Sequence, residues 1–330
     1  MRDVAALAGV SLKTVSRVVN EESGVSTDVR SRVERAINQL GYRHNLAASN
    51  LRRGNSRTGT VGVLLQDVSN SFSAGLLRSL EDAAHERDVA ILASSLDEEA
   101  QRERNLVSSL VRRRVDGLVL MPATHRQDYL AEELRSGLPV VFVDRAPHGV
   151  DADSVTVDNR RGAAEATAHL IRHGHQRIAY LGDLDTIETA QARVAGYRQA
   201  HRDAGTEADP RLEVQGLRSS EAAGDAVERL LDLDLPPTAF FAARNSLAIG
   251  TVQALRALGR VHDVAVVGFD DFPLADVLDP GLTVVRQDVR RIGTEVSRRL
   301  FARIDGDDSP PQHTVLEPTL VVRGSGEIKP

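Results

Sequence analysis

The sequence contains no cysteine, and this absence excludes several classes of site. Disulfide bonds, thiolate nucleophiles and thiolate metal ligands cannot form, which fits a reducing compartment. No run of roughly twenty uncharged apolar residues occurs that could cross a bilayer, and the N-terminus has no basic region followed by an apolar segment. We therefore expect a cytoplasmic protein that is neither embedded in a membrane nor secreted.

Catalytic and phosphate-binding motifs are also missing: the sequence has no GxxxxGK[ST], no GxGxxG after a strand, no GxSxG and no HExxH. Two weaker patterns remain, the histidines His169, His173 and His175 and the adjacent carboxylates Asp270 and Asp271. Two histidines without a carboxylate at fixed spacing are more often structural than metal ligands. Neighbouring residues at a strand end point to opposite faces, so only one of the two carboxylates can serve a given cleft. We expect no enzyme, no metal and no cofactor.

Charge is distributed unevenly along the 330 residues, whose formal net charge is −6. Residues 1–58 contain ten Lys and Arg side chains against five Asp and Glu, a net of +5. The remaining residues contain 31 basic and 42 acidic side chains, a net of −11. A small basic segment attached to an acidic body is typical of a nucleic-acid binder with a separate regulatory domain.

The basic segment has the spacing of a helix-turn-helix. Apolar residues at helical spacing from Val4 to Ala8 predict a first helix, Gly9 can adopt the positive φ of a turn, and Ser11 is placed to cap a second helix. The buried face of that second helix is predicted to contain Val15, Val18 and Val19. Its other face, which could enter a DNA major groove, carries Leu12, Lys13, Ser16 and Arg17. An ordinary pair of antiparallel helices is the alternative.

A third helix is predicted from Ser26 or Thr27, which supply the cap, to Leu40, with Gly41 as its end. Its core stripe is predicted to be Val29, Val33, Ala36, Ile37 and Leu40. The three helices together would form a domain too small to be robust alone.

The string AGVSLKTVSRVVN, followed by VSTDVRSRVERAINQLGYRHNLAASNL, resembles the DNA-binding headpiece of the lactose-repressor/galactose-repressor family. The resemblance implies a homodimeric regulator that binds palindromic operator DNA. It also implies a hinge helix that inserts Leu51 into the minor groove. The DNA contacts that it implies are Ser11, Leu12, Lys13, Thr14, Ser16, Arg17, Asn20, Tyr42, Asn45, Ala48 and Leu51.

From residue 58 onward, short Val-rich strands alternate with helical segments, which predicts an α/β fold with parallel, doubly wound sheets. The family resemblance extends here to a periplasmic-binding-protein-like core with two lobes. We expect an N-lobe of about 58–158 and 286–318, and a C-lobe of about 159–285 and 319–330. The domains are then a headpiece of residues 1–44, a hinge and linker of residues 45–57, and an effector-binding and dimerisation core of residues 58–330.

Ligands of open α/β sheets bind at the carboxyl ends of strands. The family's effector contacts, carried onto this sequence, are Phe72, Asp144, Arg145, Arg193, Arg218, Asn245, Asp270 and Gln287. We place Arg193 and Asp270 at strand ends of one lobe, where a guanidinium and a carboxylate can hold vicinal hydroxyls. The expected effector is therefore a sugar.

A sugar phosphate and a nucleoside remain open as effectors. If Arg145 and Arg218 both face the cleft, it becomes slightly positive and favours an anion. The alternative function is a soluble sugar-binding protein without DNA regulation, against which the basic N-terminal segment counts.

Overall fold

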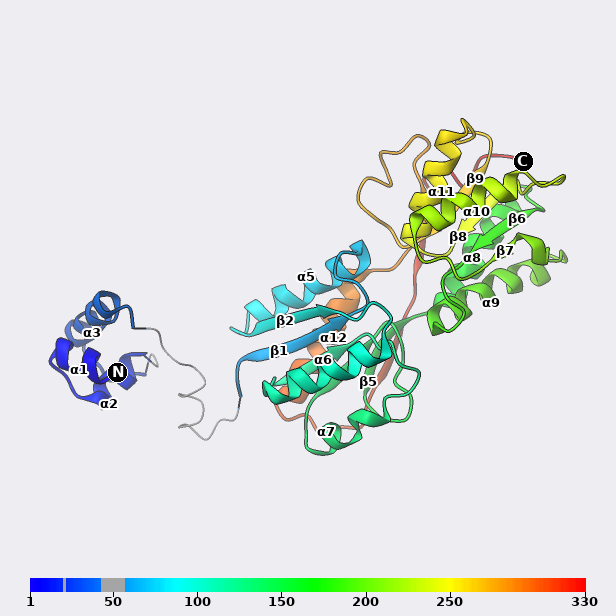
Figure 1. Ribbon diagram of the computed structural model, residues 1–330. Coiled ribbons are helices and arrows are strands. Elements are labelled where there is room, and N and C mark those ends of the chain that lie inside the picture. The colour runs from blue at the N-terminus through cyan, green and yellow to red at the C-terminus, as the bar shows by residue number, and fades with distance from the viewer. Residues whose placement is uncertain (20–21, 43–56) are drawn as a thin grey trace. The chain divides into compact units, whose positions relative to one another are not determined.

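The computed structural model describes residues 1–19, 22–42 and 57–330, which form two compact units (Figure 1). The first unit is Met1–Thr58 and contains the helix-turn-helix; the second is Gly59–Pro330 and contains both sheets. No helix within the described ranges is long and apolar enough to span a membrane.

The first unit packs α1 (Arg2–Ala8), α2 (Leu12–Val19) and α3 (Thr27–Leu40) around one small core. Gly9 adopts φ 66° and ends α1, after which the Val10 N–H donates to the Ala5 carbonyl at 3.0 Å. The buried residues of this core are Val4, Ala5, Ala8, Val15, Val18, Val33 and Ala36. The predicted buried face of α2 is largely confirmed, with Val19 only partly buried.

Two details of the predicted α3 are wrong. Leu40 is 46% exposed and is not part of the core, whereas Ile37 before it and Tyr42 after it pack against the core. Ser26 occupies the N-cap position, yet its side chain makes no capping hydrogen bond. In contrast, Ser11 does cap α2, since its Oγ accepts a hydrogen bond from the Thr14 N–H at 3.1 Å.

The N-lobe, as the structure shows it, is built on a six-stranded sheet in which all neighbouring strands are parallel. In spatial order its strands are β11 (His313–Leu316), β5 (Asp153–Val157), β4 (Val140–Val143), β3 (Gly117–Leu120), β1 (Thr60–Leu65) and β2 (Ala90–Ser95). One face packs against α5 (Ser71–His85) and α12 (Val289–Ile304). The other face packs against α6 (Ala100–Arg112) and the segment formed by η1 (Asp128–Leu130) and α7 (Ala131–Arg135).

The C-lobe has a second six-stranded sheet, whose spatial order is β12 (Thr319–Val321), β10 (Thr283–Arg286), β9 (Ala265–Phe269), β8 (Ala239–Ala242), β6 (Ile178–Leu181) and β7 (Glu213–Val214). The helices α8 (Asn159–Arg172) and α9 (Glu188–Asp203) cover one face. The opposite face is covered by α10 (Ser220–Leu231) and α11 (Asn245–Ala257), and η2 (Pro210–Leu212) precedes β7.

One strand of the C-lobe departs from the predicted parallel arrangement. The edge strand β12 runs antiparallel to β10. The chain leaves β10 toward the N-lobe and returns from β11 through Pro318, so β12 starts where β10 ends and must run in the opposite direction. The α/β class with doubly wound sheets is otherwise confirmed.

The chain passes between the lobes three times: after β5, after β10, and between β11 and β12. Segments that follow strand carboxyl ends in both sheets line one cavity between the lobes. Asn70 lies just beyond β1 and Asp144 follows β4 in the N-lobe, while Asp183 follows β6 and Asp270 follows β9 in the C-lobe. The fold therefore directs two sets of loops toward a shared interlobe cleft.

Candidate functional site

The exposed face of α2 carries the residues predicted to contact DNA. Leu12, Lys13 and Arg17 are exposed, whereas Thr14 and Ser16 are partly buried. Arg17 Nε lies 3.8 Å from Glu22 Oε2. Tyr42 packs partly buried against the core of the first unit. The other predicted DNA contacts, Asn20, Asn45, Ala48 and Leu51, lie outside the described residues.

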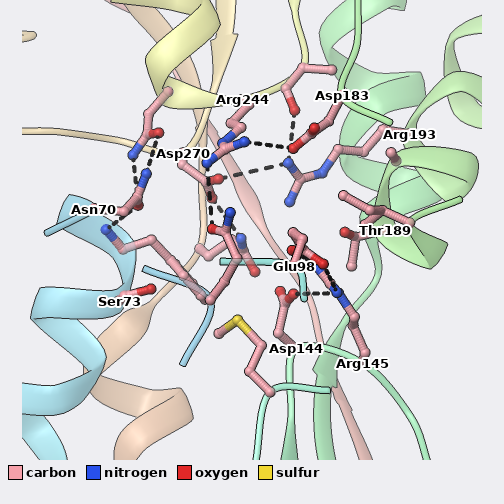
Figure 2. Close-up of a pocket in the computed structure, with 18 residues that line it drawn as sticks. Asn70, Ser73, Glu98, Asp144, Arg145, Asp183, Thr189, Arg193, Arg244 and Asp270 are labelled. Atoms are coloured by element: carbon pink, nitrogen blue, oxygen red, sulfur yellow. Dashed lines mark hydrogen bonds and ion pairs between the residues drawn. The ribbon is translucent and has the colours of Figure 1, made fainter. Parts of the chain in front are cut away.

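The interlobe cleft brings together seven of the eight predicted effector residues (Figure 2). They are Phe72, Asp144, Arg145, Arg193, Asn245, Asp270 and Gln287. Arg218 is not among the residues that line this cleft; it is exposed, and its Nη2 lies 3.5 Å from the Asp97 carbonyl. The innermost cavity is small, about 50 Å3.

Arg193 is fixed by the C-lobe on several sides. The prediction that it lies at a strand end is wrong: it lies in the second turn of α9, which begins at Glu188. Its Nε donates to Asn159 Oδ1 and its Nη1 to the Ala243 carbonyl, both at 2.8 Å. The guanidinium carbon stacks 3.8 Å from the centroid of the Phe269 ring, which adds a cation–π contact.

Asp270 is held next to this arginine. Its carboxylate lies 3.8 Å from Arg193 Nη1 and accepts a hydrogen bond from Gln287 Nε2 at 2.6 Å. The Oε1 atom of Gln287 is buried and has no hydrogen-bond partner within the described chain. A hydroxyl donor of a ligand can satisfy that carbonyl oxygen.

Asn245 lines the cleft, as predicted for an effector residue, and its side chain is hydrogen-bonded to both lobes. Its Nδ2 donates to Asn70 Oδ1 at 3.1 Å and to Ser71 Oγ at 2.9 Å. Its Oδ1 accepts from Asn70 Nδ2 at 2.9 Å and from the Ser246 N–H at 2.7 Å. Two donors and two acceptors exhaust the capacity of a carboxamide. In this structure Asn245 therefore bridges the lobes.

Arg145 is neutralised within the N-lobe by a residue that the sequence did not single out. Its Nη1 donates to Glu98 Oε2 at 2.8 Å and to the Pro122 carbonyl at 2.7 Å. Burial acts to lower the pKa of Arg145, but hydrogen bonding and charge attraction from Glu98 outweigh burial and raise this pKa. Glu98 follows β2 in a strained turn, with φ 59°.

Asp144 is the carboxylate with the least compensation in the cleft. It lies 3.7 Å from Arg145 Nε, and its side chain is only 9% exposed. Burial raises the pKa of Asp144, although the neighbouring arginines Arg145 and Arg193 act in the opposite direction. A ligand hydroxyl that donates to this carboxylate would replace the missing solvation.

The cleft does not have the slightly positive charge that would result if both Arg145 and Arg218 faced it. Its arginines, as Figure 2 shows, all have carboxylates close by. Arg244 donates to Asp183 at 2.7 Å, which adds a second pair absent from the sequence prediction. The lining contains three arginines, Arg145, Arg193 and Arg244, and four carboxylates, Glu98, Asp144, Asp183 and Asp270. With Arg218 outside, the described lining carries no excess of positive charge.

The other polar patterns of the sequence have structural partners. Asp271 accepts hydrogen bonds from Arg323 at 2.7 and 2.6 Å and does not line the cleft, so the predicted division between Asp270 and Asp271 is confirmed. His169 contacts Glu327, and His175 contacts the Thr238 hydroxyl. Within the described ranges, no cluster of three or more His, Cys, Asp and Glu side chains could hold a metal ion.

Comparisons with known proteins agree at both ends of the chain. Residues 1–45 match the family described as bacterial regulatory proteins, lacI family, and residues 167–326 match a periplasmic binding protein-like domain. The ribose operon repressor of Escherichia coli (strain K12) is 35% identical over 329 residues, which are 98% of this chain and 99% of that protein.

Solved structures extend the similarity to complete chains. The complex of the transcriptional regulator CelR with cellobiose is 35% identical, with a TM-score of 0.72 and 98% of both chains covered. The Lac repressor dimer bound to operator and the anti-inducer ONPF is 27% identical, with a TM-score of 0.85 and 98% of both chains covered.

Proposed function

The chain belongs to the lacI family of bacterial regulatory proteins, and we propose that a neutral sugar in its interlobe cleft controls its affinity for operator DNA. The protein is a DNA-binding transcriptional regulator and not an enzyme, as the sequence predicted.

The charge balance of the cleft is the observation that carries the proposal. Each arginine of the lining already has a carboxylate within 3.8 Å: Arg145 pairs with Glu98, Arg193 with Asp270, and Arg244 with Asp183. Asp144 is left as an additional acceptor, and Gln287 Oε1 has no donor within the described chain. Arg145 Nε is also buried without a hydrogen-bond partner, 3.7 Å from Asp144, and remains a donor for the ligand. Because every arginine has a carboxylate beside it and the lining has one carboxylate in excess, the site favours hydroxyl groups over a phosphate.

The relatives support a sugar of this kind. One similar protein is named for a ribose operon, and another was solved in complex with cellobiose. Phe72 adds an apolar surface to the lining, which suits the C–H side of a sugar ring. The effector residues of the proposal are Phe72, Asp144, Arg145, Arg193, Asp270 and Gln287.

We assign DNA recognition to the exposed face of α2, through Leu12, Lys13 and Arg17. The hinge role of residues 45–57, with Leu51 in the minor groove, belongs to the same proposal. The proposal includes a homodimer on a palindromic operator, and the Lac repressor structure, a dimer bound to operator that is similar over nearly the full chain, supports it. Effector binding would change DNA affinity by the difference in ligand affinity between two lobe arrangements.

Calorimetric titration with matched ligands tests the effector class. The probes are ribose, glucose and cellobiose, the corresponding ribose 5-phosphate and glucose 6-phosphate, and adenosine. We expect a neutral sugar to bind, and Asp144→Asn and Asp270→Asn each to weaken it by about ten-fold, because both substitutions keep the shape but remove a charged acceptor.

Arg218→Ala is the matched control and should leave affinity unchanged, because Arg218 does not line the cleft. Binding by the phosphorylated sugars alone, or binding of a neutral sugar that neither aspartate variant weakens, would contradict the proposal. The affinity of the protein for an operator selected from a random DNA library should then change when the same sugar is added and not when the others are.

A further inference from the structure

An outer cavity of about 340 Å3 adjoins the inner cleft. The two share Glu98, Arg145 and Ile187 as a common wall, and Figure 2 shows the first two of these next to each other. The N-lobe contributes residues 122–125 and 145–148 to the outer cavity, and the C-lobe contributes the segment before α9 and its first turn.

The two volumes determine how a ligand can be seated. The inner cavity of about 50 Å3 is far below the roughly 300 to 1,000 Å3 of ordinary small-molecule sites. The outer cavity falls within that range. A ligand anchored at Asp144 and Asp270 therefore finds most of its space beyond Arg145, in the outer cavity.

Hydrogen bonds within the protein fix the N-lobe wall of the outer cavity. Glu103 is fully buried and accepts hydrogen bonds from the Thr124 N–H at 3.0 Å, the Thr124 hydroxyl at 2.6 Å and the Tyr129 hydroxyl at 2.5 Å. The Ala123 N–H also donates to this carboxylate. These bonds hold the loop after β3 in one conformation, which lowers the entropic cost of binding.

A second set of bonds connects this loop to the one after β4. Gln127 Nε2 donates to the Thr124 carbonyl at 2.6 Å, and Gln127 Oε1 accepts from the His148 N–H at 2.8 Å. The Gln127 N–H in turn donates to the His148 carbonyl at 2.8 Å. Arg145 binds the Pro122 carbonyl at the boundary with the inner site. Both N-lobe loops are thus parts of one rigid surface.

The side chains of the outer cavity suit a second hydroxylated ring. His125 and Thr186 face it from opposite lobes, are exposed, and make no side-chain hydrogen bond within the described chain. Gln191 Nε2 donates to the Asp185 carbonyl, so Gln191 Oε1 remains an acceptor for a ligand. No Phe, Tyr or Trp is among the described residues of this lining, so a nucleobase would have no aromatic carbocycle to stack on.

We infer that the effector is a disaccharide or a larger glycoside, whose second sugar unit occupies the outer cavity against His125 and Thr186. This inference rests on the proposed function, because Asp144 and Asp270 of the inner site anchor the first unit. The only arginine among the described residues of the outer lining, Arg145, is already bound to Glu98, which disfavours an anionic group here as well.

Calorimetric titration of the full chain with sugar pairs tests this inference. The probes are glucose and cellobiose, galactose and lactose, and xylose and xylobiose. For one pair we expect the disaccharide to bind at least about ten-fold more tightly than its monosaccharide. His125→Ala and Thr186→Ala should each weaken the disaccharide by about five-fold, roughly the contribution of one neutral hydrogen bond, and leave the monosaccharide unchanged.

His85→Ala, an exposed histidine in the last turn of α5, is the matched control and should change neither affinity. If both members of every pair bind with equal affinity, and His125→Ala and Thr186→Ala bind as the wild type does, the outer site is wrong. The proposed sugar function is not affected by that result. Adenosine is titrated as a further probe, and tighter binding of adenosine than of every sugar overturns the outer site as well. If no sugar binds, the proposed function fails and this inference fails with it.

Discussion

Asp144 and Asp270 occupy equivalent positions in the two lobes. Each follows the carboxyl end of a strand with a positive φ, 68° for Asp144 after β4 and 70° for Asp270 after β9. The N–H of each donates to a neighbouring strand, to the Val155 carbonyl at 3.0 Å and to the Val285 carbonyl at 2.9 Å. A positive φ is unfavourable for residues other than glycine, and such strain is concentrated at functional sites. The two lobes thus present a carboxylate to the same cleft in the same way.

The interlobe pair of Asn70 and Asn245 should be energetically coupled. Truncating either residue to alanine removes both hydrogen bonds between the two side chains and leaves part of the other amide unsatisfied, which lowers the free energy of unfolding by about 1–3 kcal/mol. The double variant should be more stable than the sum of the two losses indicates, by about 1 kcal/mol. Urea unfolding of the wild type, the two single variants and the double variant measures this coupling. The loss of the α5 cap that Asn70 provides occurs in both variants that lack Asn70, so it cancels in the difference. Strict additivity would mean that the lobes do not depend on this contact.

Asp153 should make stability depend on pH. Its carboxylate is buried and accepts hydrogen bonds from Arg299 Nε at 3.1 Å and Arg303 Nε at 2.7 Å. Burial acts to raise the pKa of Asp153, but these bonds and one from the Gln312 N–H lower it overall. Because the folded pKa lies below the unfolded value of about 3.9, the contribution to stability is complete above that pH and is lost as the pH falls through the folded pKa.

Asp153→Asn should lower the free energy of unfolding at pH 7 by about 3–5 kcal/mol, since it removes the buried carboxylate that both arginines bond and leaves Arg299 with Asp307 alone, 3.8 Å from its Nη1. Urea unfolding between pH 7 and pH 3 should also show a shallower acid dependence for this variant than for the wild type. Asp128→Asn removes an exposed pair with Arg126 and is the control, with little expected change at pH 7. A variant that matches the control at pH 7 would rule out an anchoring role for Asp153.

Operator preference should depend on Arg17 and Lys13. Both side chains are exposed on α2 and suit the acceptors of guanine in the major groove. Arg17→Ala should weaken binding to the selected operator by about 1–3 kcal/mol and relax one position of each half-site. Arg32→Ala, on α3, should leave the selected sequence unchanged. Selection from a random DNA library measures both effects, and an identical motif from wild type and the Arg17 variant would disprove the assignment.

Two glycines that lie close together across the contact between α10 and α11 should respond in opposite ways to alanine. A Cβ on Gly250 would lie 2.0 Å from the Ser220 carbonyl oxygen, so Gly250→Ala must separate the helices and should destabilise the C-lobe by about 1–3 kcal/mol. A Cβ on Gly224 meets its nearest atoms at 3.8 Å, an ordinary contact. Gly224→Ala should therefore be neutral or stabilise by up to about 1 kcal/mol, as expected for alanine in a helix interior. Thermal unfolding of the two variants distinguishes them, and equal effects would refute the packing argument.

Local features of the sequence were sufficient to predict the headpiece and the fold class. Gly9 and Gly41 end helices because each adopts a left-handed conformation that glycine tolerates, and Ser11 caps α2 through its own side chain. The alternation of Val-rich strands with helices was enough to predict two α/β lobes, because the spacing of strand and helix is a local property. The same spacing placed Asp144 and Asp270 at strand ends.

Which partner each cleft residue binds was decided only by the tertiary structure. Asn245 is 175 residues from Asn70 in the sequence, and Arg145 is 47 residues from Glu98, so no local pattern links the members of either pair. These pairings occupy the amide of Asn245 and the Nη atoms of Arg145, and Arg218 is not among the residues that line the cleft. The sign of the charge in the cleft is therefore a tertiary property, because it depends on which carboxylates the two lobes bring beside the arginines.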